Sequence, residues 1–232
     1  MLRAVFFDAG GTLVHVDYER VRGALLRTVG RAPTVDGLAG AEYAGRAAVE
    51  AAMVSDPGLR DGSRWQIHFV GALTSLGFSP LELVKAGPEI RAEHQRSNLW
   101  TVVQPGAAAG LASLRAVGLK VACISNSDGT VERLLEQAGL SAVLDFVIDS
   151  GVVGVEKPDP AIFALALERA GVAPGEAMHV GDLYAVDVVG ARGAGLEAVL
   201  LDPLGRYGDR GCRTAPDVPT LCRELVSSLG RR

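Results

Sequence analysis

The stretch LKVACISNSDGTVERLLEQAG, residues 119–139, decides the fold class, because a strand is followed at once by a helix. Its first seven residues form a short apolar run typical of a buried strand, and the run ends at Ser125 and Asn126. From residue 128 onward, apolar residues recur at helical spacing until Gly139. A buried strand joined to a helix by a short polar turn predicts one βα unit of a parallel sheet.

The same alternation surrounds this unit on both sides. An apolar run at the N-terminus ends at Asp8, and short apolar runs alternate with helical patterns from residue 143 to the C-terminus. Further strands are expected at 143–149, 177–182 and 197–202, and helices at 159–171, at 185–195 and from about Pro219. The fold class is therefore predicted to be α/β, with a Rossmann-like parallel sheet covered by helices and ligands at the carboxyl ends of its strands.

Residues 17–102 have a different pattern, because they lack strand runs and are rich in Ala, Leu, Arg and Glu at helical spacing. Helices are expected at 18–30, 40–54, 63–77 and 81–95, with a turn-rich break at 55–63. We therefore predict an α/β core formed by residues 1–16 and 103–232, with an inserted α-helical domain at 17–102.

Composition limits the possible partners and location of the protein. The chain has 232 residues, 48% of them hydrophobic, and a net charge of −4, which argues against nucleic acid and against an anionic membrane as partners. No apolar stretch reaches the length of a membrane span, and the N-terminal apolar run is too short for a signal peptide. Three cysteines fit neither a disulfide framework nor a zinc site. A reduced, cytoplasmic protein is expected, and its oligomeric state is not indicated.

Polar residues stand where the expected strands end. Asp8 ends the first strand, Ser125 and Asn126 end the strand of the opening βα unit, and Asp182 ends the strand at 177–182. Because the carboxyl ends of parallel strands meet at one edge of a sheet, these side chains are expected in one crevice. Lys157, just before a helix marked by prolines, brings an ammonium group to the same edge.

Three carboxylates in one crevice indicate a cation. Asp187 follows Asp182 by about one helical turn, so it can reach back toward Asp182 and Asp8. Oxygen ligands of this kind suit Mg²⁺, while a hydroxyl, loop amides and a lysine suit phosphate oxygens. A carboxylate that faces a phosphate held by Lys157 and Mg²⁺ can attack phosphorus and form an acyl phosphate.

With these residues in place, the chain resembles the haloacid dehalogenase superfamily of hydrolases, in the branch with a helical cap inserted after the first motif. The first motif is matched by DAGGTL (8–13) except at its second acid, and the second by Ser125 in VACISNSDG. The third is matched by Lys157 in GVEKPDP, and the fourth by GDLYAVD (181–187). The four motifs come in the family's order and cover nearly the whole chain.

The resemblance assigns roles to the acidic residues and the lysine. It implies that Asp8 is the nucleophile and a Mg²⁺ ligand, together with Asp182 and the backbone carbonyl of Gly10. It implies that Lys157 supports catalysis and that Asp187 is either a further ligand or orients Lys157.

The same resemblance assigns a phosphate-binding group. Ser125 and Lys157 would hold the phosphate, with Thr12 and Asn126 in support, and the partner would be a small phosphorylated metabolite. His179, inside an expected strand, is interpreted as a packed core histidine.

Gly10 stands where the family has the acid that protonates the leaving alcohol and later activates water. Losing such a group typically costs about 10²–10⁴ in rate. The favoured interpretation is a Mg²⁺-dependent phosphatase that manages without it, either on substrates with good leaving groups or with another residue in its place. The candidates for that replacement are His15, Tyr184, His68 and His94.

Two other interpretations stay open at this point. A dehalogenase needs no acid because halide leaves unprotonated, although members of that type usually replace the metal-binding acid that Asp182 represents. A non-catalytic protein could keep the fold and bind a phosphorylated ligand, or serve a regulatory role.

Overall fold

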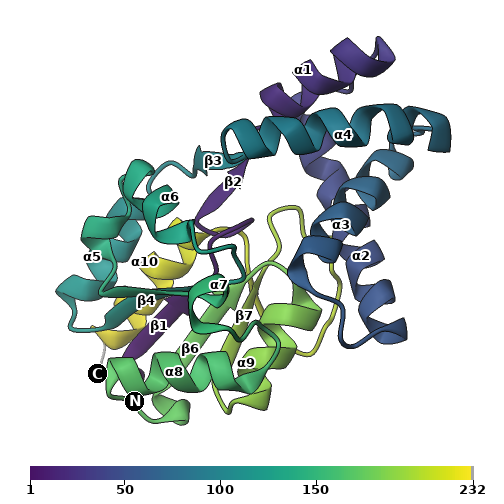
Figure 1. Cartoon of the computed structure of the whole chain (residues 1–232). Coiled ribbons are helices and arrows are strands. Elements are labelled where there is room, and N and C mark those ends of the chain that lie inside the picture. Colours follow the sequence, from purple (N-terminus) through teal and green to yellow (C-terminus); the bar gives the residue numbers. More distant parts are fainter. Residues whose placement is uncertain (231–232) are drawn as a thin grey trace. The chain divides into compact units, whose positions relative to one another are not determined.

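The computed structural model describes residues 1–230, and the chain forms two compact units (Figure 1). The α/β unit contains Met1–His15 and the chain from Val102 onward, and the helical unit contains Val16–Thr101. Among residues 1–230, no helix has the length and the hydropathy needed to cross a membrane.

The α/β unit is built on a six-stranded sheet in which every pairing is parallel, in the order β5-β4-β1-β6-β7-β8 (Figure 1). This confirms the predicted fold class. β8 was not predicted, because it has three residues, two of them exposed, and so lacks an apolar run. The strands are β1 (Ala4–Phe7), β4 (Lys120–Ser125), β5 (Phe146–Asp149), β6 (Ala177–Gly181), β7 (Glu197–Leu201) and β8 (Arg213–Ala215).

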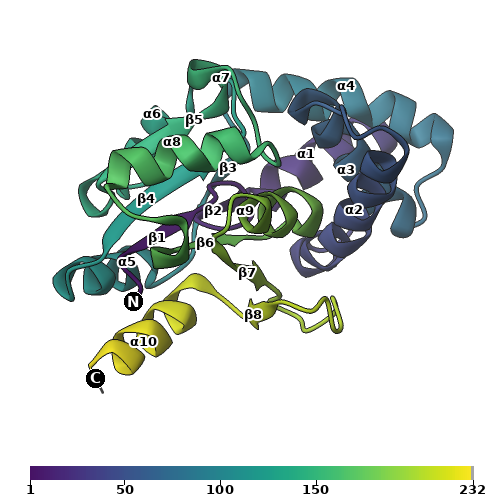
Figure 2. The same ribbon diagram turned by 90° about the horizontal axis from the view of Figure 1, so that it is seen from below.

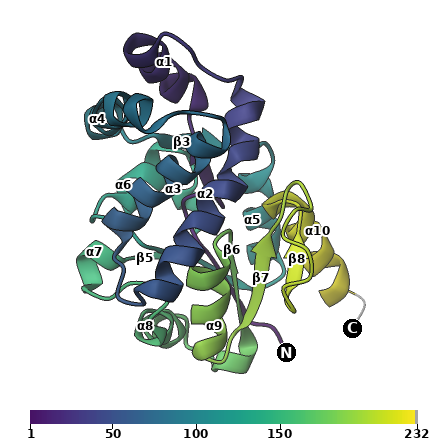
Figure 3. The ribbon, with the colours of Figure 1, turned by 90° about the vertical axis from the view of Figure 1, so that its right-hand side faces the viewer.

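Helices cover both faces of this sheet. α8 and α9 pack on one face through a shared apolar cluster, and α5 and α10 pack together on the other (Figures 2 and 3). The α-helices are α5 (Ala107–Ala116), α6 (Val131–Gln137), α7 (Ser150–Val153), α8 (Pro160–Ala170), α9 (Val189–Gly193) and α10 (Val218–Leu229). Two short 3₁₀ turns, η1 (Ser141–Val143) and η2 (Pro174–Glu176), complete the connections.

The segment expected as one helix at 185–195 is two different helices. η3 (Tyr184–Val188) is a π-helical turn, in which the backbone N–H of Val189 donates to the carbonyl of Tyr184, and α9 follows it. Such wide turns are rare and are found mostly at functional sites. The regular spacing that predicts a helix therefore hides a local widening, and it occurs at the turn that carries Asp187.

The helical unit contains the four helices expected in its sequence: α1 (Tyr18–Val29), α2 (Val35–Ser55), α3 (Asp61–Ser75) and α4 (Pro80–Arg96). α2 begins five residues before the expected position 40, because the Thr34 side chain accepts a hydrogen bond from the backbone N–H of Gly37 and caps the helix. α2 and α3 approach closely at two glycines. A β-carbon at Gly71 would lie 2.6 Å from that of Ala48, so the packing requires a residue without a side chain there.

The chain passes between the units through two short strands, β2 (Val14–Val16) and β3 (Trp100–Val103), which pair with each other. The sequence pattern predicts no strand at the junction of the two units. Strands of three and four residues, partly exposed, carry too few apolar positions for the pattern to be seen.

Candidate active site

Asp8 lies at the centre of the carboxyl edge of the sheet. β1, which precedes it, is fully buried and lies between β4 and β6, so the first motif stands beside the ends of both neighbours. The backbone N–H of Asp8 donates to the carbonyl of Val180 in β6 at 2.8 Å. This bond extends the sheet pairing to Asp8, so its carboxylate starts from a fixed backbone.

Lys157 connects two of the acidic side chains. Its ammonium nitrogen lies 2.7 Å from Oδ1 of Asp8 and 2.7 Å from Oδ1 of Asp187, and the side chain is 1% exposed. Asn126 fixes the lysine backbone, since its Oδ1 accepts from the Lys157 N–H at 2.8 Å and its Nδ2 donates to the Lys157 carbonyl at 2.9 Å. Two motifs 31 residues apart are thereby joined at one point.

Asp187 is held by three donors. Its Oδ1 accepts from Lys157 and lies 3.0 Å from Nε2 of His179, while its Oδ2 accepts from the backbone N–H of Leu183 at 3.0 Å. Burial alone would raise the pKa of Asp187, but Lys157 and His179 outweigh it and hold the pKa below its usual range. Both oxygens of the Asp187 carboxylate are therefore already engaged, one of them by Lys157.

His179 is a core residue with an additional role. It is fully buried and meets the ring of Phe163 edge-on, as the interpretation from sequence required, but it also contacts Asp187. Burial lowers the pKa of His179, so its imidazole is neutral and Nε2 carries the proton that it donates. Sequence alternation places His179 in a buried strand but gives no indication of this contact.

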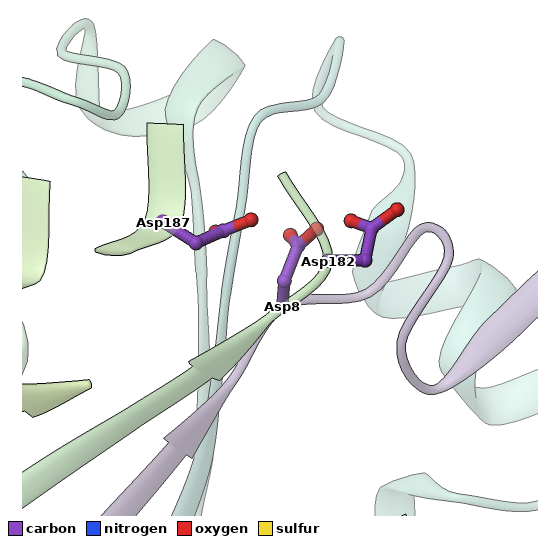
Figure 4. A group of neighbouring side chains, drawn as sticks. All are labelled: Asp8, Asp182 and Asp187. Carbon is purple, nitrogen blue, oxygen red and sulfur yellow. The ribbon is translucent and has the colours of Figure 1, made fainter. Parts of the chain in front are cut away.

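Asp8, Asp182 and Asp187 form a cluster of carboxylates at one end of the sheet, and Figure 4 shows the Asp8 side chain between the other two. Each offers an oxygen, and these oxygens lie within 4.8 Å of one another. Burial raises the pKa of Asp8 to about 7, and the charges of Asp187 and Asp182 add to the rise while Lys157 opposes it. Carboxylate oxygens are the ligands that a hard divalent cation such as Mg²⁺ prefers. Such a cation would also stabilise the charge of Asp8, which burial and the neighbouring carboxylates disfavour.

Glycine at position 11 allows this cluster to form. Gly11 has a φ of +73°, and a β-carbon there would lie 2.2 Å from Oδ2 of Asp182. Any side chain would therefore both strain the backbone and displace the Asp182 carboxylate. Gly10 does not have a positive φ, and its backbone pairs with Val14 in an isolated bridge, so its backbone conformation does not itself require glycine.

The two hydroxyls that the sequence singled out are buried in the same unit. Ser125 ends β4 with 4% of its surface exposed, and its hydroxyl lies 3.4 Å from the carbonyl of Asn126. Thr12 is fully buried, and its hydroxyl has no hydrogen-bond partner among residues 1–230. A buried hydroxyl of this kind has a free capacity to donate to a ligand.

Two of the four residues considered as replacement acids are engaged inside the helical unit. Burial lowers the pKa of His68 to about 4, so His68 carries no proton to give at neutral pH. His94 packs against Trp65 and Trp100, and its Nδ1 accepts from the backbone N–H of Leu99 at 3.3 Å. These contacts disfavour both histidines as general acids.

The other two replacement candidates lie in the α/β unit. Tyr184 is half-buried at the start of η3, beneath the guanidinium of Arg210, and His15 is half-buried in β2.

Tyr207 is a residue near the acidic cluster that the sequence patterns did not indicate. Its hydroxyl donates to the backbone carbonyl of Asp182 at 2.8 Å, yet it lies outside every motif.

Comparison with known protein families places this geometry in context. The sequence profile of the haloacid dehalogenase-like hydrolases matches residues 2–195. Mouse haloacid dehalogenase-like hydrolase domain-containing protein 3 is 44% identical over 102 residues, which are 44% of this chain and 40% of that protein. The chain thus matches less than half the length of this relative.

Another relative is matched over more of its length. The phosphoserine phosphatase of Thermus thermophilus is 39% identical over 170 residues, covering 70% of this chain and 67% of that protein. Among solved structures, the L-2-haloacid dehalogenase of Xanthobacter autotrophicus superposes with a TM-score of 0.65 at 24% identity, covering 97% of this chain and 98% of the other. At that identity, the likeness concerns the fold alone.

Proposed function

The chain belongs to the haloacid dehalogenase-like hydrolases, and we propose that it is a phosphatase of a small phosphorylated metabolite with Asp8 as the nucleophile. The observation that carries the proposal is the Lys157 ammonium group, 2.7 Å from the carboxylates of both Asp8 and Asp187. A buried cation beside a nucleophilic carboxylate is what an incoming phosphate dianion needs, because the two negative charges otherwise repel. The similarity to a phosphoserine phosphatase supports this substrate class.

The proposed reaction has two displacements at phosphorus. An oxygen of Asp8 forms a bond to phosphorus while the bond to the leaving oxygen breaks, which gives an aspartyl phosphate. Water then attacks that phosphorus, the bond to Asp8 breaks, and inorganic phosphate leaves with the proton that water loses. Ser125, Thr12 and Lys157 would hold the phosphate oxygens through both steps, and Asn126 would support them through the lysine backbone.

The acidic cluster fits Mg²⁺, and we propose that Asp8, Asp182 and the carbonyl of Gly10 hold it. When bound, the ion neutralises charge on the phosphate and on Asp8. Asp187 is assigned to orienting Lys157, because its oxygens already accept hydrogen bonds from Lys157, His179 and Leu183.

Gly10 predicts which substrates turn over well. No side chain at this position protonates the leaving oxygen, so departure depends on how stable that oxygen is as an anion. Phenolic and other acidic leaving groups should therefore react faster than alkoxides, by up to the 10²–10⁴ that a positioned acid typically provides.

The test is hydrolysis of p-nitrophenyl phosphate with and without Mg²⁺. Wild type, Asp8→Asn and a control with an exposed acid removed, Asp36→Asn, are compared. Metal-dependent turnover that disappears in Asp8→Asn and persists in Asp36→Asn supports the proposal. Equal turnover by wild type and Asp8→Asn would refute it.

Gly10 also favours a second candidate, dehalogenation, because halide leaves without protonation. The cluster of Asp8 with Asp182 and Asp187 weighs against it, since displacement at carbon needs no divalent cation. Release of chloride from 2-chloropropionate without metal, together with no turnover of aryl phosphates, would favour the dehalogenase.

A further inference from the structure

The loop that follows β7 reaches back to the acidic cluster. Tyr207, in this loop, donates from its hydroxyl to the backbone carbonyl of Asp182 at 2.8 Å. The two residues are 25 positions apart, and Tyr207 belongs to no motif of the family that the sequence matches. The contact therefore links a loop without assigned function to a residue of the cluster.

Tyr207 is itself held in place at its backbone. Asp202, the first residue after β7, accepts from the N–H of Arg206 through Oδ1 at 2.9 Å and from the N–H of Tyr207 through Oδ2 at 3.1 Å. The N–H of Asp202 donates to the carbonyl of Ala215 in β8 at 2.9 Å. The hydrogen bonds thus run from the sheet, through the Asp202 carboxylate, to the Tyr207 backbone.

The ring of Tyr207 is also fixed. The guanidinium of Arg210 lies 5.3 Å from the centre of the Tyr207 ring and 5.1 Å from that of Tyr184, so it stacks against both. Tyr184 begins the π-helical turn that carries Asp187. The loop is therefore attached at Asp182 and at Tyr184, the first residue of the turn that carries Asp187.

Asp182 is constrained on its other side by the first motif. The carboxylate lies so close to the Gly11 Cα that a β-carbon there would overlap with it. Gly11 thus limits where the Asp182 carboxylate can lie, and Tyr207 limits where the Asp182 backbone can lie. Together they limit how Asp182 can face Asp8.

We propose that Tyr207 is a positioning residue for the metal site, which acts through the Asp182 backbone to hold the Asp182 carboxylate toward Asp8. The inference rests on the proposed function, because it requires the cluster to bind Mg²⁺. This role requires no contact of Tyr207 with metal or substrate. Mutation of a residue that orients a metal ligand in this way typically lowers metal affinity or activity by about 10–100-fold.

The variant Tyr207→Phe removes the hydroxyl and keeps the ring that stacks with Arg210. The metal-free full-length protein is titrated with Mg²⁺ by isothermal calorimetry, and its melting temperature is recorded in parallel. We expect Mg²⁺ to bind about ten-fold more weakly, at the lower end of that range. At saturating Mg²⁺, the KM for p-nitrophenyl phosphate should stay within about two-fold of wild type, because the residue acts through the metal site. The control is Cys212→Ser, a one-atom change in the same loop region.

The outcomes separate the inference from the proposal beneath it. If wild type binds no Mg²⁺, the proposed metal chemistry fails and Tyr207 has nothing to position. If wild type binds Mg²⁺ and Tyr207→Phe binds it equally well, only the positioning role is refuted. A fall in the melting temperature of Tyr207→Phe with unchanged Mg²⁺ affinity also refutes it, because it shows a purely structural bond. Weaker binding in Tyr207→Phe, with Cys212→Ser like wild type, establishes it.

Discussion

The two sides of the acidic cluster differ in how completely they are built. On one side, Lys157 and Asp187 are each 1% exposed and are joined to each other, to His179 and to the Leu183 backbone. On the other side, the loop after β1 has no side chain at Gly10 and a buried Thr12 hydroxyl without a partner among residues 1–230. The lysine side is fixed before any ligand arrives, whereas the loop side has unused binding capacity.

In the proposed phosphatase, this difference separates two tasks of phosphoryl transfer. Positioning and charge neutralisation would depend on the lysine side, where the hydrogen bonds are in place. Proton transfer to the leaving group would depend on position 10, which has no group to perform it. The site is therefore predicted to bind a phosphate ester, and to displace its leaving group well only where that group departs readily as an anion.

Removal of the Lys157 ammonium group should have the largest effect. Lys157→Met should lower kcat/KM for p-nitrophenyl phosphate by about 10³-fold, because the variant loses the buried cation that offsets the negative charges of nucleophile and phosphate. The same change leaves Asp8 and Asp187 without their shared partner, so the melting temperature should also fall. Stopped assays at a temperature where the variant is folded measure the rate.

The matched control for that experiment is Lys120→Met. Lys120 is 55% exposed and pairs with Asp145 at 3.7 Å, so its loss should leave both rate and stability near wild type. A folded Lys157→Met protein with wild-type turnover would show that the lysine side is structural only.

Gly10→Asp tests the loop side of the acidic cluster, where position 10 has no acid. It should raise kcat on alkyl phosphates by about 10²-fold and change kcat on p-nitrophenyl phosphate much less, because p-nitrophenolate leaves without a proton. Position 10 has no positive φ, so the backbone should accept the new side chain. Steady-state assays on the two substrate types measure the effect.

Gly10→Asn is the control for that gain, since it has the same shape and no acid. Equal gains in the two variants would mean that the added side chain acts by filling space, and the proton-transfer argument would be wrong.

Much of the architecture could be predicted because it depends on regular patterns. The strands β4, β5, β6 and β7 and the four helices of the second unit are long enough for their apolar spacing to be clear. Asp8 and Asp182 could be selected because parallel strands bring their carboxyl ends to one edge. Asp187 could be selected because it follows Asp182 by about one helical turn, and Lys157 because it precedes a helix marked by prolines.

What the sequence could not provide depends on contacts between distant or irregular segments. His179 looks like any buried strand residue until its distance to Asp187 is known. Tyr207 occupies an irregular loop, so no periodicity indicates that it reaches Asp182. The π-helical turn at Tyr184–Val188 has the same apolar spacing as an α-helix, and its widening follows from packing rather than from residue type.

The raised pKa of Asp8 predicts an unusual pH dependence of stability without metal. The folded protein holds a proton on Asp8 up to about pH 7, whereas the unfolded chain releases it near 3.8. Asp8 therefore makes the folded state progressively less stable as pH rises from about 4 to 7. Asp8→Asn removes this titration, so without metal the melting temperature of the variant relative to wild type should rise by on the order of 5 °C between pH 5 and pH 8.

Mg²⁺ supplies the internal check on that difference. At pH 8, added Mg²⁺ should raise the melting temperature of wild type and leave that of Asp8→Asn nearly unchanged. Scanning calorimetry measures both melting temperatures. Equal differences between the two proteins at pH 5 and pH 8 would contradict the assigned titration.

The smallest predicted effect concerns Thr12, and here stability and binding should move in opposite directions. Thr12→Val replaces a buried hydroxyl, without a partner among residues 1–230, by a methyl group of similar size. The free protein should be as stable as wild type or slightly more so, because an unsatisfied buried hydroxyl costs about 1–3 kcal/mol. Inorganic phosphate should bind about 2–10-fold more weakly, since one neutral hydrogen bond contributes about 0.5–1.5 kcal/mol.

Thr130→Val is the contrasting control, because the Thr130 hydroxyl already donates to Asp128 at 2.6 Å. The loss of that hydroxyl should lower stability slightly and leave phosphate affinity unchanged. If Thr12→Val instead lost stability and kept phosphate affinity, the Thr12 hydroxyl would belong to the fold, and the loop side would be as complete as the lysine side.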